Sequence, residues 1–163
     1  MESVELDTAP ETALQRQRWV NFRLGAQAFG LDVLTVQEVL CLPALAPVPG
    51  APPECLGVIN LRGRIIPVID LRQLLARPYG EDAETTRLVV VDDGDEAVAL
   101  KVDQVGEVLD LPASTIEAAP DVGNSLCPDQ LHGVHRRGDR LLLLLDTAAV
   151  LRTASSRIAG VGR

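Results

Sequence analysis

The residues with the chemistry best suited to metal binding lie near the end of the sequence. Cys127, His132 and His135 form a C-x4-H-x2-H pattern. Thiolate and imidazole are good zinc ligands, but a structural zinc site needs four ligands, and no standard zinc motif has this spacing. A small metal-binding enzyme or sensor that uses these residues is therefore a distant alternative, and a surface loop without metal is the simpler interpretation.

The other reactive residues form no catalytic pattern. The two histidines are the only conventional general bases, and no serine lies in a G-x-S-x-G elbow. Neither glycine-rich phosphate-binding motif occurs. The acidic run 92–96 lacks the ligand spacing of a calcium loop and is better explained as an Asp-Gly turn. We therefore predict no catalytic residue, no metal and no cofactor.

Three charged residues are better suited to recognition. Arg62 lies between Leu61 and Gly63 at an expected hairpin tip, where its guanidinium either remains in solvent or binds a carboxylate or backbone carbonyls. Glu38 and Glu107 each lie in the pattern V-x-E-V-L-x-L-P. A lone carboxylate in such a segment marks either the solvent side of a half-buried strand or the charged member of a partner-binding ridge.

Short strands joined by tight turns are expected to position these residues. Residues 19–33 alternate apolar and polar side chains on either side of a glycine, which predicts a hairpin. Residues 57–71 predict a second hairpin that turns at Arg62 and Gly63, since glycine adopts the positive φ that a tight turn requires. A short helix over 71–76 follows.

The second half of the sequence repeats the first. Residues 19–43 and 88–112 align without a gap at an offset of 69 and share eleven of 25 positions, the clearest match being VQEVLCLP with VGEVLDLP. Further residues recur at an offset of 76, namely Gly57, Val58, Arg64 and Asp70 as Gly133, Val134, Arg140 and Asp146. These matches indicate an internal duplication.

The two pseudo-repeats, about 19–76 and 87–152, are each too small to bury a large core alone. We therefore expect two small strand-rich units that pack against each other around a shared core of Val, Leu and Ile. Each unit is expected to form a twisted sheet that curls towards a barrel, with a groove where the two meet. Residues 1–16 and 153–163 are expected to be flexible arms flanking a domain over 17–152.

Composition excludes several classes of partner. The chain of 163 residues carries 23 acidic and 15 basic side chains, for a net charge of -8, and has one Trp, one Tyr and two Phe. Nucleic-acid binding is disfavoured because it needs clustered Lys and Arg or exposed aromatic rings. No apolar run approaches the roughly 18 residues of a membrane span, and the acidic N-terminus is unlike a signal peptide. We expect a cytoplasmic protein that does not insert into the membrane.

The sequence also contains a family signature. The run GVINLRGRIIPVIDLR at 57–72, with VQEV at 36–39, PVPGAP at 47–52 and VDQVGEVLDLP at 102–112, resembles the CheW-type chemotaxis coupling proteins. The likeness covers residues 18–152. It implies a mainly β fold with short helices, in which two SH3-like five-stranded β-subdomains surround a shared hydrophobic core, and it implies no catalysis.

The resemblance also implies partners and site residues. Proteins of this family are adaptors that join the cytoplasmic tips of methyl-accepting chemoreceptors to the regulatory domain of a CheA-type histidine kinase, in arrays at the membrane. The positions that match family residues implicated in receptor or kinase coupling are Val36, Glu38, Arg62, Val105 and Val108, and those that match the signature turn region are Gly57, Asn60 and Gly63.

Two departures from the family pattern leave the pathway open. Ala99 stands where the family usually has Gly, and Arg87 stands where an apolar residue is common. The alternative to chemotaxis proper is therefore an accessory chemosensory system that governs surface motility, biofilm formation or development.

Overall fold

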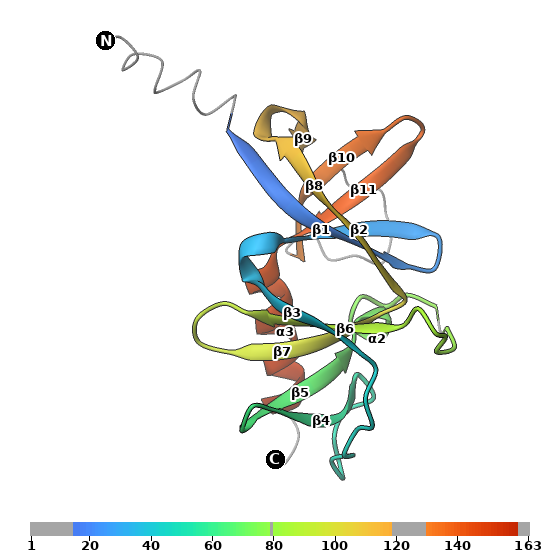
Figure 1. Ribbon diagram of the computed structural model, residues 1–163, viewed down its shortest axis with the longest axis vertical. Helices are drawn as coiled ribbons and strands as arrows, with labels where there is room; N and C mark the ends of the chain where they lie inside the picture. Colours follow the sequence, from blue (N-terminus) through green and yellow to red (C-terminus); the bar gives the residue numbers. More distant parts are fainter. Residues whose placement is uncertain (1–14, 79, 119–129, 160–163) are drawn as a thin grey trace.

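The strands form two sheets, one in the upper and one in the lower half of Figure 1. The computed structural model describes residues 15–78, 80–118 and 130–159. Sheet A has the strand order β8-β1-β2-β11-β10-β9 and sheet B the order β3-β6-β7-β5-β4. The strands of sheet A are β1 (Arg16–Leu24), β2 (Gln27–Asp32), β8 (Gln104–Pro112), β9 (Ile116–Glu117), β10 (Leu131–Arg137) and β11 (Arg140–Leu145). Those of sheet B are β3 (Val36–Cys41), β4 (Cys55–Leu61), β5 (Arg64–Asp70), β6 (Arg87–Asp92) and β7 (Ala97–Val102).

This architecture confirms the expected mainly β fold with two sheets and short helices. Sheet B has five strands, and sheet A has the same five-stranded arrangement with the two-residue strand β9 added at its edge. The helices are α2 (Leu71–Leu74) and α3 (Thr147–Ala159), with the 3-10 turns η2 (Val33–Thr35) and η3 (Ala113–Thr115). Within the described ranges, none of the helices has both the length and the apolar character needed to cross a membrane.

Each sheet combines strands of both sequence repeats. The hairpin β1-β2 of the first repeat pairs with β8 and β11 of the second, while β6-β7 of the second repeat pairs with β3 and β5 of the first. The two sheets consequently have matching strand orders. Each strand of the first repeat has the same position in its sheet as the corresponding strand of the second repeat has in the other sheet. The expectation that each half of the sequence forms a strand-rich unit of its own is therefore wrong, although the duplication itself is visible in the topology.

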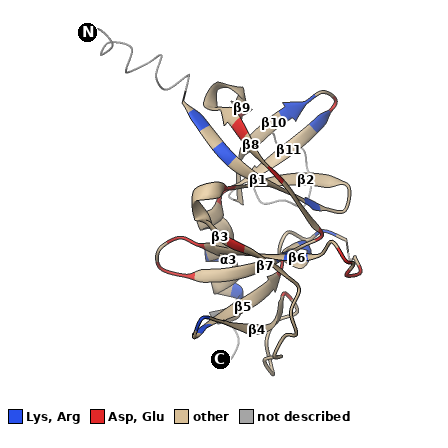
Figure 2. Ribbon diagram, in the orientation of Figure 1, with Lys and Arg blue, Asp and Glu red and all other residues tan. Residues whose placement is uncertain are grey.

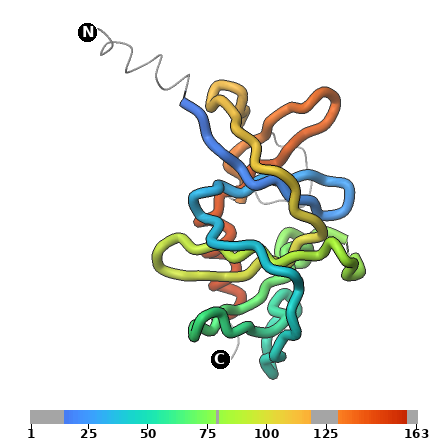
Figure 3. The backbone as a smooth tube through the Cα atoms, viewed as in Figure 1, coloured from blue at the N-terminus to red at the C-terminus, as the bar shows by residue number. Residues whose placement is uncertain are grey.

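Two short connections cause this exchange. After β2 the turn η2 carries the chain from sheet A into sheet B, and after β7 the single residue Asp103 carries it back to sheet A (Figure 3). The backbone N–H of Asp103 donates to Arg23 O at 3.0 Å, and its carboxylate accepts from Gly25 N at 2.7 Å. These bonds attach the crossing point to the β1-β2 hairpin.

The central strands bury both faces, which creates a shared core. On β6, Val89 and Val91 belong to a large apolar cluster with residues from both sheets, whereas Leu88 and Val90 belong to a smaller cluster within sheet B. On β11 the same alternation divides Leu143 and Leu145 from Leu142 and Leu144, which pack with Trp19 inside sheet A. Successive strand residues point to opposite faces, so each sheet covers a small core of its own and contributes its other face to the common one.

Aspartates that recur in the two repeats begin the helices. Asp70 Oδ1 accepts from Arg72 N at 3.1 Å at the start of α2, and Asp146 Oδ1 accepts from Ala149 N at 3.2 Å at the start of α3. Such caps satisfy backbone donors that have no partner inside the helix. The recurrence of these aspartates at an offset of 76 is therefore explained by their role as helix caps.

Both expected chain boundaries differ from the structure. Arg16 is already part of β1, and Gln15 O accepts from Ala113 N at 2.7 Å, so the sheet begins before residue 17. At the other end α3 continues to Ala159, because Ala154 is fully buried and Ile158 packs against the shared core. The expected flexible tail is thus wrong for residues 153–159. Residues 1–14 and 160–163 lie outside the described residues.

Candidate partner-binding site

The turn between β4 and β5 presents Arg62 at its tip. Arg62 and Gly63 have φ values of 55° and 84°, and Leu61 pairs with Arg64, so the two strands are joined by a two-residue turn. Positive φ at both central residues is the geometry that best matches the twist of a hairpin. Asn60 Oδ1 accepts from Gly63 N at 2.8 Å and stabilises the turn. The side chain of Arg62 is 75% exposed.

Glu38 orients this arginine. It lies on β3, an edge strand of sheet B, where the pairing with β6 shifts register between Val36 and Glu38. Arg62 Nη1 and Glu38 Oε1 are 2.7 Å apart. An ion pair at the surface typically contributes about 0–1 kcal/mol to stability, so this pair adds little to stability and favours a position of the guanidinium next to the edge strand. The structure thus brings together Glu38, Asn60, Arg62 and Gly63 of the predicted site.

A second ion pair completes this surface. Arg64 Nη1 lies 3.1 Å from Asp92 Oδ2. The hydrogen bond from Gly94 N to Asp92, with the nearby Arg64 guanidinium, holds the pKa of this carboxyl below its ordinary value. The two pairs line a groove of about 240 Å³, here called the first groove, with a floor that includes Ile66, Val90 and Ala97.

The first groove is equipped for recognition. Its charged groups pair with one another, and its described lining contains no serine, cysteine or histidine that could act as a nucleophile or general base. Fixed guanidinium and carboxylate groups beside apolar side chains suit contact with another protein. Figure 2 shows the basic residues of the β4-β5 turn at the lower left.

The predicted valines do not join this cluster. Val36 on β3 and Val105 on β8 are partly buried against the shared core. Val108 is 45% exposed, but it lies on β8, an edge strand of sheet A. The repeat mate of Val108 is Val39 on β3, which is 42% exposed and was not among the predicted residues. The offset of 69 in the sequence could have identified it.

Another exposed apolar residue was also missed. Leu34, in the turn η2 that leads into β3, is 84% exposed. Large apolar side chains in contact with water often mark interaction surfaces when they lie together. Nothing in the hydrophobic pattern distinguished Leu34 from core leucines, because exposure at a chain crossing depends on the arrangement of the sheets.

Gly57 has a structural role. Its φ is 147°, and a Cβ atom placed there would lie 2.6 Å from Ala46 O. Ala46 and Val58 exchange backbone hydrogen bonds of 3.2 and 2.9 Å, so the glycine allows the proline-rich loop to pack on β4. Any side chain would displace this loop.

The metal hypothesis finds no support in the described residues. No group of three or more His, Cys, Asp or Glu side chains there could hold a metal ion. The His132 ring lies 5.3 Å from the Trp19 ring, and burial lowers the pKa of His135, with a smaller effect from Arg137. Cys127 lies outside the described residues.

Comparison with known proteins gives a consistent result. Residues 18–155 match the model of the family described as "CheW-like domain". The chain is 36% identical over 135 residues to Chemotaxis protein CheW of Klebsiella aerogenes, covering 83% of this chain and 81% of that protein. It is 32% identical over 143 residues to Chemotaxis protein CheW of Bacillus subtilis, covering 88% and 92%.

A solved structure agrees with this result. The crystal structure of scaffolding protein TtCheW from Thermoanaerobacter tengcongensis superposes with a TM-score of 0.74 at 29% identity, over 81% of this chain and 85% of that one. Relatives with other names include Protein PilI of Pseudomonas aeruginosa, 32% identical over 79% of this chain and 72% of that protein, and Protein FrzA of Myxococcus xanthus, 30% identical over 91% and 97%. The family match spans nearly all of the described fold and includes both sheets, and the chain therefore belongs to the CheW-like family.

Proposed function

We propose that this protein is a non-catalytic scaffold that couples methyl-accepting chemoreceptors to a CheA-type histidine kinase in chemotaxis-like signal transduction. The observation that carries the proposal is the family match over residues 18–155, together with likeness to a solved scaffolding protein across both sheets. A cytoplasmic location at receptor arrays, reached through these partners, follows from the same proposal.

The first groove and its edge strand are the proposed contact surface for one partner. The largely exposed Arg62 pairs with the partly buried Glu38, and the exposed Val39 lies on the same edge strand as Glu38. An apolar surface with a fixed charge gives both buried area and register to a bound helix tip or partner domain. Val108 on β8 would belong to a separate contact surface, because it lies in the other sheet.

A second candidate keeps the scaffold role but changes the system. The relatives PilI and FrzA have names that do not refer to chemotaxis. They favour, as the alternative, a coupling protein of an accessory system for surface motility, biofilm formation or development. The receptor and kinase that bind would distinguish the two.

Binding measurements with purified partners test the proposal. Receptor cytoplasmic fragments and kinase regulatory domains from the source cell would be immobilised, and the affinities of wild type, Glu38→Gln and Arg62→Gln compared. We expect the wild type to bind at least one member of each class. Each variant should weaken one of these interactions by about tenfold, since a hydrogen-bonded charge is lost at the contact.

An exposed arginine outside both proposed contact surfaces provides the control. Arg152 is an exposed residue of α3. Arg152→Gln removes the same charge as Arg62→Gln and should leave the affinity unchanged. If the wild type binds no receptor fragment and no kinase domain, the scaffold proposal is wrong. If it binds and both groove variants bind equally well, the assignment of the first groove is wrong.

A further inference from the structure

A larger groove on sheet A corresponds to the first groove through the sequence repeat. This second groove has a volume of about 770 Å³, compared with about 240 Å³ for the first. Glu107 and Arg140 line it, and they are the repeat mates of Glu38 and Arg64. Arg137 also lines it, at the strand position that Leu61 has beside the first turn, since Arg137 pairs with Arg140 as Leu61 pairs with Arg64. Their elements also correspond, since β8 takes the place of β3 and the β10-β11 turn that of the β4-β5 turn.

An exchange of charge is one of the differences between the two grooves. In the first groove Arg64 pairs with Asp92. The repeat mate of Asp92, at an offset of 69, is Arg23, which lines the second groove together with Arg140. The second groove therefore has a guanidinium at the position of the carboxylate that pairs with Arg64 in the first groove.

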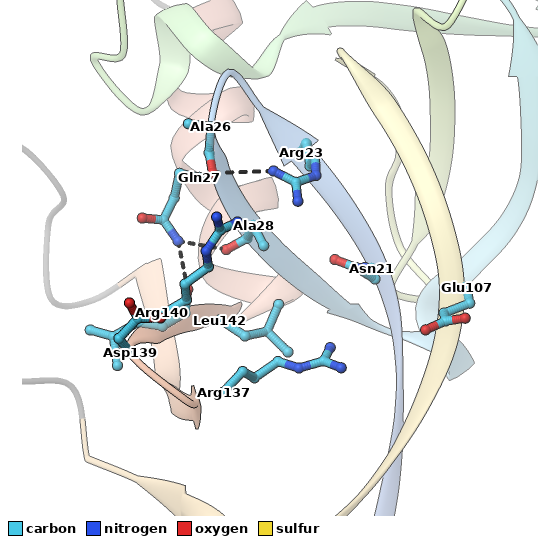
Figure 4. A pocket seen from close by; sticks show the side chains of 11 residues that line it. Asn21, Arg23, Ala26, Gln27, Ala28, Glu107, Arg137, Asp139, Arg140 and Leu142 are labelled. Carbon is cyan, nitrogen blue, oxygen red and sulfur yellow. Dashed lines mark hydrogen bonds between the residues drawn. The ribbon is translucent and has the colours of Figure 1, made fainter.

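The arginines of the second groove remain available. Arg23 Nη1 donates to Ala26 O at 3.3 Å (Figure 4). Among the described residues, none of Arg23, Arg137 and Arg140 forms an ion pair, whereas both arginines of the first groove do. The lining also contains the carboxylates of Glu107 and Asp139, so three guanidinium groups leave this open cavity with a net positive charge, which favours an anion although the whole chain has a net charge of -8.

The lining indicates what kind of anion fits. Seven of the eleven lining residues are polar or charged, whereas sites for small molecules are predominantly apolar. A polar groove beside the exposed edge strand β8 is more typical of the outer part of a protein interface. Guanidinium groups bind carboxylates through paired hydrogen bonds, and a carboxylate, that of Asp92, pairs with Arg64, the equivalent of Arg140 in the first groove.

We propose that the second groove, bounded by Arg23, Arg137 and Arg140, binds acidic side chains of a partner polypeptide. One carboxylate of the partner pairs with Arg140, in the same way as Asp92 pairs with Arg64 in the first groove. The inference goes beyond the proposed scaffold function, because it does not depend on which receptor or kinase the protein serves.

An NMR titration of the full chain tests this inference. The probe is a short, end-capped peptide of alternating Glu and Ser, and the matched peptide has Gln in place of Glu. At low ionic strength, the acidic peptide should shift backbone amide signals of residues 23–28 and 137–142, and the Gln peptide should not. Glutarate serves as a small dicarboxylate and should bind at least about tenfold more weakly than the acidic peptide, since fewer charge-assisted bonds form.

Two variants remove the site in different ways. Arg23→Asp places a carboxylate at the position that corresponds to Asp92 of the first groove. We expect this carboxylate to pair with Arg140 and so to block the site. Arg140→Gln removes the guanidinium on an exposed residue. Each should weaken peptide binding by about tenfold or more. Arg64→Gln in the first groove, and Arg152→Asp on the exposed side of α3 with the same change of charge as Arg23→Asp, should leave binding unchanged.

The outcomes separate the interpretations. Binding of the acidic peptide that is lost in both groove variants and kept in both controls supports the inference. Absence of binding by the wild type, equal binding of the Gln peptide, or undiminished binding by Arg23→Asp and Arg140→Gln overturns it. Glutarate binding as tight as that of the peptide also overturns it, because the groove would then be a small-molecule site. The dispersion of the amide signals shows in each case that the variant is folded.

Discussion

At the scale of single residues, Arg62 combines a local strain with an exposed charge. Its φ of 55° is in the left-handed region, which costs a residue with a Cβ atom about 1 kcal/mol. Its guanidinium meanwhile pairs with Glu38 on the edge strand. Asn would fit the backbone position better, so the arginine is explained by what its side chain contacts.

Arg62→Asn should separate stability from binding. Asn-Gly is the most favourable sequence for this type of turn, so we expect the free energy of unfolding to stay equal or rise by up to about 1 kcal/mol. Partner affinity should nevertheless fall as in Arg62→Gln. Urea denaturation and the binding assay measure the two effects. Arg62→Val, which also removes the charge but tolerates positive φ poorly, should lower stability. A clear loss of stability in Arg62→Asn would contradict this account.

At the scale of elements, Asp103 joins the two sheets. Its carboxylate accepts hydrogen bonds from Gly25 N at 2.7 Å and from Arg72 Nε at 3.0 Å. Arg72 lies in α2 and Gly25 in the turn between β1 and β2. Burial tends to raise the pKa of Asp103, but the hydrogen bonds from Arg72 and Gly25 outweigh it and leave the pKa below its ordinary value of 3.8.

This shift predicts a pH dependence of stability. Because the pKa of Asp103 is lower in the folded than in the unfolded state, its ionised form stabilises the fold above the unfolded pKa. That stabilisation should be lost as the pH falls below about 4 and through the folded value. Urea denaturation at pH 7 and at pH 3 should show a smaller difference for Asp103→Asn than for wild type. Asp95→Asn, on the exposed β6-β7 turn, should retain the wild-type difference, and an unchanged difference in Asp103→Asn would contradict the assignment.

At the scale of the whole molecule, the exchange of strands makes the two sheets depend on each other. Each sheet needs strands from both repeats, and the largest apolar cluster contains residues of both sheets and both helices. The helix α3 extends from sheet A to the lower end of sheet B in Figure 1, and Arg157 near its end contacts Glu54. Neither sheet can form from the strands of one half of the sequence alone.

The two sheets should consequently unfold together. Ile66→Ala changes a buried residue inside sheet B and should lower the free energy of unfolding by about 2–4 kcal/mol. Trp19, the only tryptophan, lies in the core of sheet A, and its fluorescence should report the same shift as far-UV circular dichroism. Trp19 fluorescence that keeps the wild-type midpoint would show instead that the sheets unfold independently.

Much of the fold and the family were predictable because they depend on short stretches of chain. Alternating apolar residues predicted the hairpins, and Arg62-Gly63 predicted the turn. The repeat at offsets of 69 and 76 predicted two related sheets. The helical continuation after residue 152 was missed because Ala154 and Ile158 form only a weak apolar stripe, and its burial depends on the core beneath it.

By itself the sequence determined the strands, their turns, the duplication and the family, since backbone preference and side-chain alternation act within a few residues. Only the tertiary structure decided that the repeats exchange hairpins, because the same apolar pattern could pair within a repeat or between repeats. The tertiary structure also placed Glu38 next to Arg62 and put Val108 in the other sheet. The exchange itself placed Arg23 of the first repeat in the same groove as Arg140 of the second, a combination of charges that arises only from contacts between distant parts of the chain.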